Sequence, residues 1–237
     1  MATTPFCLEL SGGGRVVGDE RSGAAPCYVF LHGLGSTRSG EKSASLLAHA
    51  ARQGRGFLRF DMRGHGESSG ELGRVKVRQL IDDAVQVLER TGPAVVVGSS
   101  LGALVAAHAA AQRPDLFDRL ALLAPAFGLM PSLAAHLDEH GYLALGGAPL
   151  FYVDPAVRED AASLDETALP ARVRAPTLIV HGTADDVIPP RASERFFGAM
   201  RTNDKQLWLV EGGDHRLTDV AAEIWQRVDA LPPPATR

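Results

Sequence analysis

The sequence is poor in cysteine and aromatic residues, has no excess of positive charge and contains no long apolar run. Only two cysteines occur in 237 residues, Cys7 and Cys27, and both adjoin strand-like apolar residues. So few cysteines in such places favour two buried, reduced thiols over a disulfide framework. Neither cysteine lies at a strand-to-helix turn, which disfavours a cysteine nucleophile.

The charge balance is slightly acidic, with a formal net charge of −4 and with Lys and Arg scattered along the chain. Because no basic stripe is present to neutralise phosphates, nucleic acid is not expected as a partner. No apolar run approaches the roughly 20 residues needed to span a bilayer, so no membrane span is expected. Residues 1–6 lack the charged and apolar regions of a secretory signal. The two reduced cysteines favour a cytoplasmic protein.

The residues that are present alternate between short apolar runs and longer helix-like stretches. This alternation predicts a parallel sheet with helices on both faces, and the length fits one α/β domain. Apolar runs typical of strands buried on both faces occur at 28–31, 57–60, 94–97, 120–123, 177–180 and 206–210. Helices are expected at 40–52, 76–90, 101–112, 191–201 and 217–230.

Two regions depart from this alternation. Residues 1–26 are rich in glycine and predict an N-terminal hairpin with strands at 7–10 and 15–17. Residues 126–170 contain no clear strand but many apolar residues, and they are too long for a bare loop. We therefore expect a single domain spanning 1–237, with a small helical lid inserted at about 126–170.

A candidate nucleophile lies where an apolar strand meets a helix. Gly98–Gly102 matches G-x-S-x-G, and it follows the apolar run 94–97 and precedes a stretch rich in helix formers. A nucleophile elbow needs this strand and this helix, which assigns the role to Ser100. The strained backbone of such a serine also requires small neighbours. A second match, Gly66–Gly70, lies among loop-like residues and is expected to be accidental.

A serine hydroxyl is a weak nucleophile and needs a base that a third group orients. Among eight histidines, His215 follows the last expected strand in a glycine-containing loop that can reach the elbow. The acid should lie between nucleophile and base in chain order. Asp185 and Asp186 both follow the penultimate strand, so the residues alone leave that choice open.

The negative charge that develops on the substrate oxygen needs two backbone N–H donors. One is expected from Leu101, the residue after the nucleophile. The other is expected from the glycine-rich loop after strand 28–31, where Leu34 lies between Gly33 and Gly35. These two glycines free the backbone of Leu34 to turn toward the elbow.

Taken together, the motifs resemble the α/β-hydrolase superfamily and occur in its order. The matching segments are His32–Gly35, Arg59–Ser68, Gly98–Gly102, His181–Pro189 and Asp214–His215. The resemblance implies a mostly parallel eight-stranded sheet with one early antiparallel strand. It also implies that Asp185 is the acid and that Arg63–Ser68 is a structural loop.

A narrower resemblance is carried by the elbow and two further strand ends. Val97–Gly102, Arg59–Asp61 and Gly213–Arg216 are similar to the palmitoyl-protein thioesterase and acyl-glucuronide esterase branch. The expected function is therefore a serine esterase or thioesterase that cleaves small-molecule esters or thioesters. The apolar lid predicts hydrophobic acyl or aryl substrates. This chemistry needs no metal and no cofactor.

Two alternatives come from other classes of protein. His136-Leu-Asp-Glu139-His140 matches H-x-x-E-H, which would place two zinc ligands on one helix face of a metallopeptidase. That helix would be bounded by Pro131 and Gly141, and no third ligand is evident. The second alternative is a non-catalytic binding protein on a hydrolase scaffold, since a fold does not dictate a function.

Overall fold

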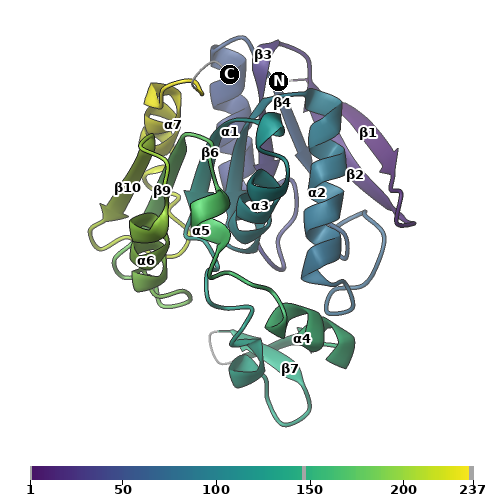
Figure 1. Cartoon of the computed structure of the whole chain (residues 1–237). Helices are drawn as coiled ribbons and strands as arrows, with labels where there is room; N and C mark the ends of the chain where they lie inside the picture. Colours follow the sequence, from purple (N-terminus) through teal and green to yellow (C-terminus); the bar gives the residue numbers. More distant parts are fainter. Residues whose placement is uncertain (1, 146–147, 235–237) are drawn as a thin grey trace.

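The computed structural model describes residues 2–145 and 148–234, and its centre is an eight-stranded sheet (Figure 1). The strand order is β1-β2-β4-β3-β5-β6-β9-β10. The strands are β1 (Thr4–Glu9), β2 (Arg15–Arg21), β3 (Ala24–Leu31), β4 (Arg55–Phe60), β5 (Ala94–Ser99), β6 (Phe117–Leu123), β9 (Thr177–Gly182) and β10 (Lys205–Val210). All six runs expected as strands are confirmed, as is the N-terminal hairpin.

One strand of the sheet runs against the others. β2 pairs antiparallel with both β1 and β4, whereas the remaining pairs are parallel. This is the mostly parallel sheet with one early antiparallel strand that the family resemblance implied. Parallel strands bring their carboxyl ends to one edge, and in such sheets that edge holds the ligand.

Helices cover both faces of the sheet and create two separate cores. Successive residues of β5 alternate between them: Val95 and Val97 pack in one core and Val96 in the other. One core is closed by α1 (Glu41–Arg52) and α7 (Ala221–Ala230), and the other by α2 (Val77–Thr91), α3 (Leu101–Gln112) and α6 (Arg191–Ala199). Burial on both faces explains why the central strands read as continuous apolar runs.

The expected helical lid at 126–170 is only partly helical, which corrects the sequence prediction. A two-stranded antiparallel sheet joins β7 (Tyr142–Leu145) to β8 (Ala148–Tyr152). The segment also holds the 3₁₀ helix η2 (Leu133–His136) and the helices α4 (Pro155–Ala162) and α5 (Leu169–Arg172). Tyr142 is 42% exposed, whereas its neighbour Leu143 is 1% exposed. Successive residues of a strand alternate between its two faces in this way. The run is too short for that alternation to stand out in sequence.

The two cysteines also differ from expectation in burial. Both are free thiols, as predicted, but Cys7 is exposed on β1 and Cys27 is half-buried on β3. β1 forms one edge of the sheet, and Cys7 points to the face opposite that of Phe6 and Leu8, which pack against a core. Burial raises the pKa of the Cys27 thiol to about 12, which leaves that thiol protonated and unreactive.

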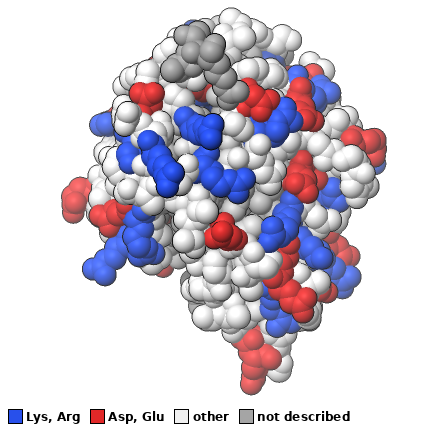
Figure 2. Space-filling view, in the orientation of Figure 1, with Lys and Arg blue, Asp and Glu red and all other residues white. Residues whose placement is uncertain are grey.

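The surface carries charges of both signs. Figure 2 shows acidic side chains lying among basic ones over the face that Figure 1 presents, as the scattered sequence charges led us to expect. Among the described residues, no helix combines the length and apolar character needed to cross a bilayer.

Candidate active site

Ser100 lies at a sharp turn between β5 and α3. Its backbone adopts φ 54° and ψ −115°, a strained conformation for a residue with a side chain. A Cβ on Gly98 would lie 2.4 Å from the Gly102 carbonyl oxygen, and one on Gly102 would lie 2.4 Å from carbonyl oxygens of β3 and the residue after it. Glycine is required at both positions because the turn packs directly against backbone. The elbow geometry expected from the sequence is therefore present.

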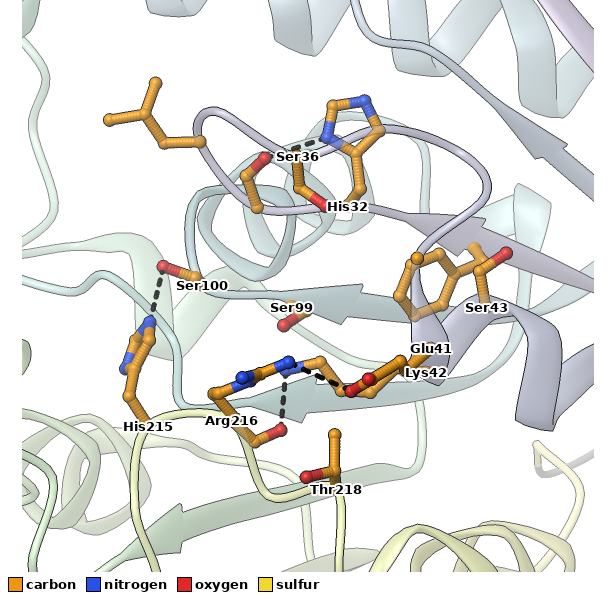
Figure 3. A pocket seen from close by; sticks show the side chains of 14 residues that line it. His32, Ser36, Glu41, Lys42, Ser43, Ser99, Ser100, His215, Arg216 and Thr218 are labelled. Atoms are coloured by element: carbon orange, nitrogen blue, oxygen red, sulfur yellow. Dashed lines mark hydrogen bonds and ion pairs between the residues drawn. The ribbon is translucent and has the colours of Figure 1, made fainter. Parts of the chain in front are cut away.

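The structure brings the three predicted side chains of the triad together from three loops. His215 Nε2 lies 3.1 Å from Ser100 Oγ, and His215 Nδ1 lies 2.7 Å from Asp185 Oδ2 (Figure 3 draws the first contact). With the carboxylate accepting from Nδ1–H, Nε2 is free to accept the serine hydroxyl proton. The arrangement forms a hydrogen-bonded chain from a carboxylate through an imidazole to a hydroxyl.

The choice between the two aspartates, open in the sequence, is decided by orientation. The Asp185 side chain is fully buried and faces His215, whereas Asp186 is exposed. Asp185 Oδ1 accepts the N–H groups of Val187 and Ile188. Burial acts to raise the pKa of Asp185, but the hydrogen bonds from His181, His215 and Ile188 outweigh it and lower the pKa well below its usual range. Asp185 is therefore a carboxylate at any pH near neutrality.

His181 contacts the acid, a role that the sequence interpretation missed. Its Nε2 lies 3.0 Å from Asp185 Oδ2 and 2.9 Å from the Ile188 carbonyl oxygen. Its Nδ1 lies 2.7 Å from Ser193 Oγ, so the ring accepts there and donates from Nε2. The signal in the sequence was the spacing of His181 and Asp185 across the end of β9, and the sequence analysis assigned His181 no role.

The loop after β3 lies directly against the nucleophile. A Cβ on Gly33 would lie 3.3 Å from Ser100 Cβ. Within the described residues, the Leu34 N–H donates to no protein acceptor. Leu101 is the first residue of α3, where backbone N–H groups have no partner in the helix. Both expected oxyanion donors thus belong to segments that flank Ser100.

A histidine from the neighbouring loop holds this segment in place. His65 Nε2 accepts the Gly35 N–H at 3.1 Å, and its Nδ1 lies 3.2 Å from the Arg63 carbonyl oxygen. Burial lowers the pKa of His65, which keeps the ring neutral and able to accept. Ser68, the centre of the second G-x-S-x-G match, donates to the Asp61 carbonyl oxygen at 2.6 Å and accepts the Val17 N–H. The resemblance assigned this loop a structural role, and its contacts are structural.

Two cavities with different linings adjoin the elbow. The larger, of about 360 Å³ and termed the polar pocket, is lined by Ser100 and His215 and by residues of α1 including Lys42, together with Phe30 and Leu34 (Figure 3). A smaller cavity of about 60 Å³ is lined by Leu34 and Leu101 and by apolar side chains of the 126–170 segment. Those side chains are Met130, Leu133, Leu143, Phe151, Val153 and Val157.

The H-x-x-E-H motif does not lie on a helix. His136 ends η2, and Glu139 and His140 belong to the following turn, both strongly exposed. Among the described residues, no cluster of three or more His, Cys, Asp or Glu is arranged to hold a metal ion. The metallopeptidase alternative therefore lacks the helix face on which it depended.

Comparison with known families matches most of the chain to one of them. The sequence model of a family described as serine aminopeptidase, S33, matches residues 24–151 and 157–219. The chain belongs to this α/β-hydrolase family. The matched region contains the elbow, both candidate oxyanion donors, Asp185 and His215.

Among individual relatives of this α/β hydrolase, the palmitoyl-protein thioesterase ABHD10, mitochondrial, of Rattus norvegicus is 27% identical over 221 residues. The match covers 84% of this chain and 72% of that protein. A solved structure of mouse alpha/beta hydrolase domain-containing protein 10 superimposes with a TM-score of 0.82 at 26% identity, covering 95% and 96% of the two chains. The expected resemblance to the palmitoyl-protein thioesterase branch is confirmed.

A more distant likeness extends to an esterase structure. Est1E from Butyrivibrio proteoclasticus with ferulic acid bound has a TM-score of 0.79 at 20% identity, and the match covers 95% of this chain and 99% of that one. At this identity the likeness shows the fold alone.

Proposed function

We propose that this α/β hydrolase is a serine esterase or thioesterase that cleaves esters or thioesters of hydrophobic acyl or aryl groups. The observation that carries the proposal is the hydrogen-bonded chain from Asp185 through His215 to Ser100, with contacts of 2.7 and 3.1 Å. The substrate is a small molecule, and the reaction requires no cofactor or metal ion.

In the proposed first step, His215 Nε2 accepts the Ser100 proton while Ser100 Oγ attacks the substrate carbonyl carbon. Asp185 holds the imidazole in the tautomer that leaves Nε2 unprotonated, and its negative charge stabilises the imidazolium that forms. The N–H groups of Leu34 and Leu101 receive the negative charge that develops on the carbonyl oxygen. Because these donors are fixed before the reaction, they cost no reorganisation in the transition state.

The second half of the reaction returns the enzyme to its starting state. The tetrahedral intermediate collapses, the bond to the leaving oxygen or sulfur breaks, and that atom takes the proton from His215. Water then attacks the acyl-enzyme with His215 as base, which releases the acid and restores the Ser100 hydroxyl.

The apolar cavity supports the assignment of a hydrophobic acyl or aryl group. It adjoins the two oxyanion residues, and every side chain that the described part of the 126–170 segment adds to it is apolar. The segment would then act as the lid that the sequence analysis expected. The relatives named as palmitoyl-protein thioesterases support thioester cleavage by homology. They are named as mitochondrial, so the cytoplasmic location expected for this chain stays a prediction.

The experiment that tests the proposal compares Ser100→Ala with Ser68→Ala on matched ester, thioester and amide substrates. Loss of Ser100 is expected to lower kcat by at least about a thousandfold, whereas Ser68→Ala, at the second motif, keeps the triad intact. Turnover that is equal in Ser100→Ala and the native protein would overturn the proposal. That result together with retained ligand binding would favour the binding-protein alternative. Full activity after chelation is expected, and its loss would revive the zinc alternative.

A further inference from the structure

Acyl transfer divides the substrate into an acyl group and a leaving group, and each needs a cavity beside Ser100. The inference rests on the proposed function. The oxyanion points at the N–H groups of Leu34 and Leu101. Leu101 lines the apolar cavity, and Leu34 lies between the two cavities and lines both. The leaving atom must face His215 Nε2 to take its proton, and His215 and Ser100 line the polar pocket. The proposed function assigns the hydrophobic acyl group to the apolar cavity, which leaves the polar pocket, beside His215, for the leaving group.

The polar pocket is rich in groups that bind polar ligands. Figure 3 shows Ser100 and His215 beside this pocket, with Glu41 and Lys42 near Arg216. Four hydroxyl groups in the lining have no hydrogen-bond partner among the described residues, and they belong to Ser36, Ser43, Ser99 and Thr218. The 126–170 segment adds no side chain to the described lining. Hydroxyl groups without partners favour a leaving group that is itself polar.

Among the described residues, Lys42 forms no ion pair with a carboxylate, unlike Arg216, which lines the same pocket. The Lys42 ammonium donates one hydrogen bond, to the Arg216 carbonyl oxygen at 2.8 Å. Within the described residues, no carboxylate oxygen lies within ion-pair distance of Lys42, although an ammonium has two more N–H bonds to donate. Arg216, by contrast, is paired with Glu41 at 3.0 Å. Lys42 is half-buried in the same pocket as Ser100, and two of its N–H bonds have no acceptor among the described residues.

The carboxylates that surround Lys42 are engaged elsewhere. Asp185 is bonded to His215 and His181, and Asp214 Oδ1 accepts the backbone N–H groups of Arg216 and Leu217. Burial lowers the pKa of Lys42 to about 8, partly offset by attraction to Asp214, Asp185 and Glu41. Lys42 is therefore mostly charged at neutral pH, and its remaining N–H bonds are available to a ligand in the pocket.

From this arrangement, we propose that Lys42 is a specificity-determining residue that binds an anionic substituent, such as a carboxylate, on the leaving group of the ester or thioester. The acyl carbon then exchanges its bond to the leaving atom for a bond to Ser100 Oγ. The leaving atom departs with the proton from His215, and the anionic substituent remains in contact with Lys42 throughout.

Two esters of the same short acyl group test this assignment. One carries 4-hydroxybenzoate as its leaving group and the other carries methyl 4-hydroxybenzoate, so they differ in one negative charge remote from the reacting bond. The quantity measured is the ratio of kcat/KM for the charged ester to that for the neutral ester. In Lys42→Gln this ratio is expected to fall about tenfold, the effect of losing one hydrogen bond to a charged group. Lys42→Arg, which keeps the charge, is expected to retain most of the ratio.

A matched control removes a lysine elsewhere. Lys76 is exposed at the start of α2, so Lys76→Gln changes the net charge equally and is expected to leave the ratio unchanged. A Lys42→Gln variant that slows both esters by the same factor would overturn the proposal, because Lys42 would then only anchor the His215 loop through the Arg216 carbonyl. An equal fall of the ratio in Lys76→Gln would also overturn it, because the effect would be general electrostatics.

The failure of this inference differs from the failure of the proposed function. If the inference alone is wrong, both esters are hydrolysed and the ratio is the same in native protein and Lys42→Gln. If the proposed function is wrong, neither ester is hydrolysed through Ser100, and Ser100→Ala matches the native protein. Thermal unfolding of each variant shows that a changed ratio arises in folded protein.

Discussion

The polar pocket and the apolar cavity flank the same nucleophile, yet the chain builds them from different parts. The polar pocket is formed by β3, β5, α1 and the loops that follow β3 and β10, which belong to the sheet and its direct connections. The apolar cavity takes about half of its lining from the 126–170 segment, which lies beyond the carboxyl end of β6 (Figure 1). One side is held by hydrogen bonds between loops, and the other by apolar packing.

This difference separates the chemistry from the fit of the substrate. His181, His215 and the Asp185 carboxylate form a hydrogen-bonded network in which each group restricts the next. Such networks tolerate little change, whereas apolar cavities accept side chains of similar volume at modest cost. Substitutions in the Asp185–His215 network should therefore alter rate, and substitutions in the 126–170 segment should alter the choice of acyl group.

The largest effect is expected at the acid of the network. Asp185→Asn keeps the shape of the side chain but favours the wrong His215 tautomer, and kcat is expected to fall about 10⁴-fold. Asp186→Asn is the matched control because Asp186 is exposed and adjacent in sequence. Steady-state kinetics on one activated ester checks both variants. Equal rates for Asp185→Asn and native protein would show that the network does not serve catalysis.

A smaller, selective effect is expected in the apolar cavity. Phe151 lines it from β8, so Phe151→Ala enlarges the cavity and favours longer acyl chains. Room for two further methylene groups corresponds to roughly tenfold in kcat/KM for the longer ester. A panel of esters with increasing acyl length measures the shift. Tyr142→Ala changes an exposed aromatic residue of the same hairpin, and an equal shift there would argue against a role for the cavity.

On the polar side, the preference for a charged leaving group should depend on pH. The ammonium of Lys42 is the attracting form, and its pKa is lowered to about 8 by burial, with Arg216 repelling it and Asp214, Asp185 and Glu41 attracting it. The preference is therefore expected to be full near pH 7 and to decline by about half near pH 8. The ratio of the two esters is measured from pH 6.5 to 9.5, because a ratio cancels any effect of pH on the catalytic steps that both esters share. A constant ratio would contradict the assignment of Lys42.

The smallest effect concerns stability and involves two histidines outside the triad. Burial lowers the pKa of His32 and of His108 to about 4, from the ordinary value of 6.5. Because the folded pKa is depressed, the stability that each contributes is present above pH 6.5 and is lost as the pH falls toward 4. Urea unfolding at pH 7 and 4.5 should show a loss of about 2 kcal/mol for each histidine. His108→Leu should remove its share, and an unchanged loss would contradict this explanation.

The sequence predicted the sheet side of the molecule far better than the 126–170 segment. Central strands buried on both faces consist of continuous apolar runs, and the elbow requires Gly98 and Gly102. Both features can therefore be recognised in the amino-acid sequence. The hairpin of the 126–170 segment was missed because β7 is only four residues long and consists of Tyr, Leu and Ala, which also suit helices.

Contacts between loops that lie far apart in the sequence could not be predicted either. Lys42 reaches the Arg216 carbonyl across 174 positions of sequence, and no local pattern encodes that contact. The choice of Asp185 over Asp186 likewise depended on which side chain turns inward, and the residues alone left it open. Side-chain direction within a turn is set by backbone geometry that spacing alone does not specify.

The central claim is that Ser100 is the one residue that receives the acyl group between the two cavities. Labelling the protein with a fluorophosphonate and locating the adduct by peptide mass spectrometry tests it most directly. The account predicts a single adduct on Ser100, lost in Ser100→Ala and much slower to form in Asp185→Asn. An adduct on Ser68 or Ser99, or no adduct on the folded protein, would contradict it.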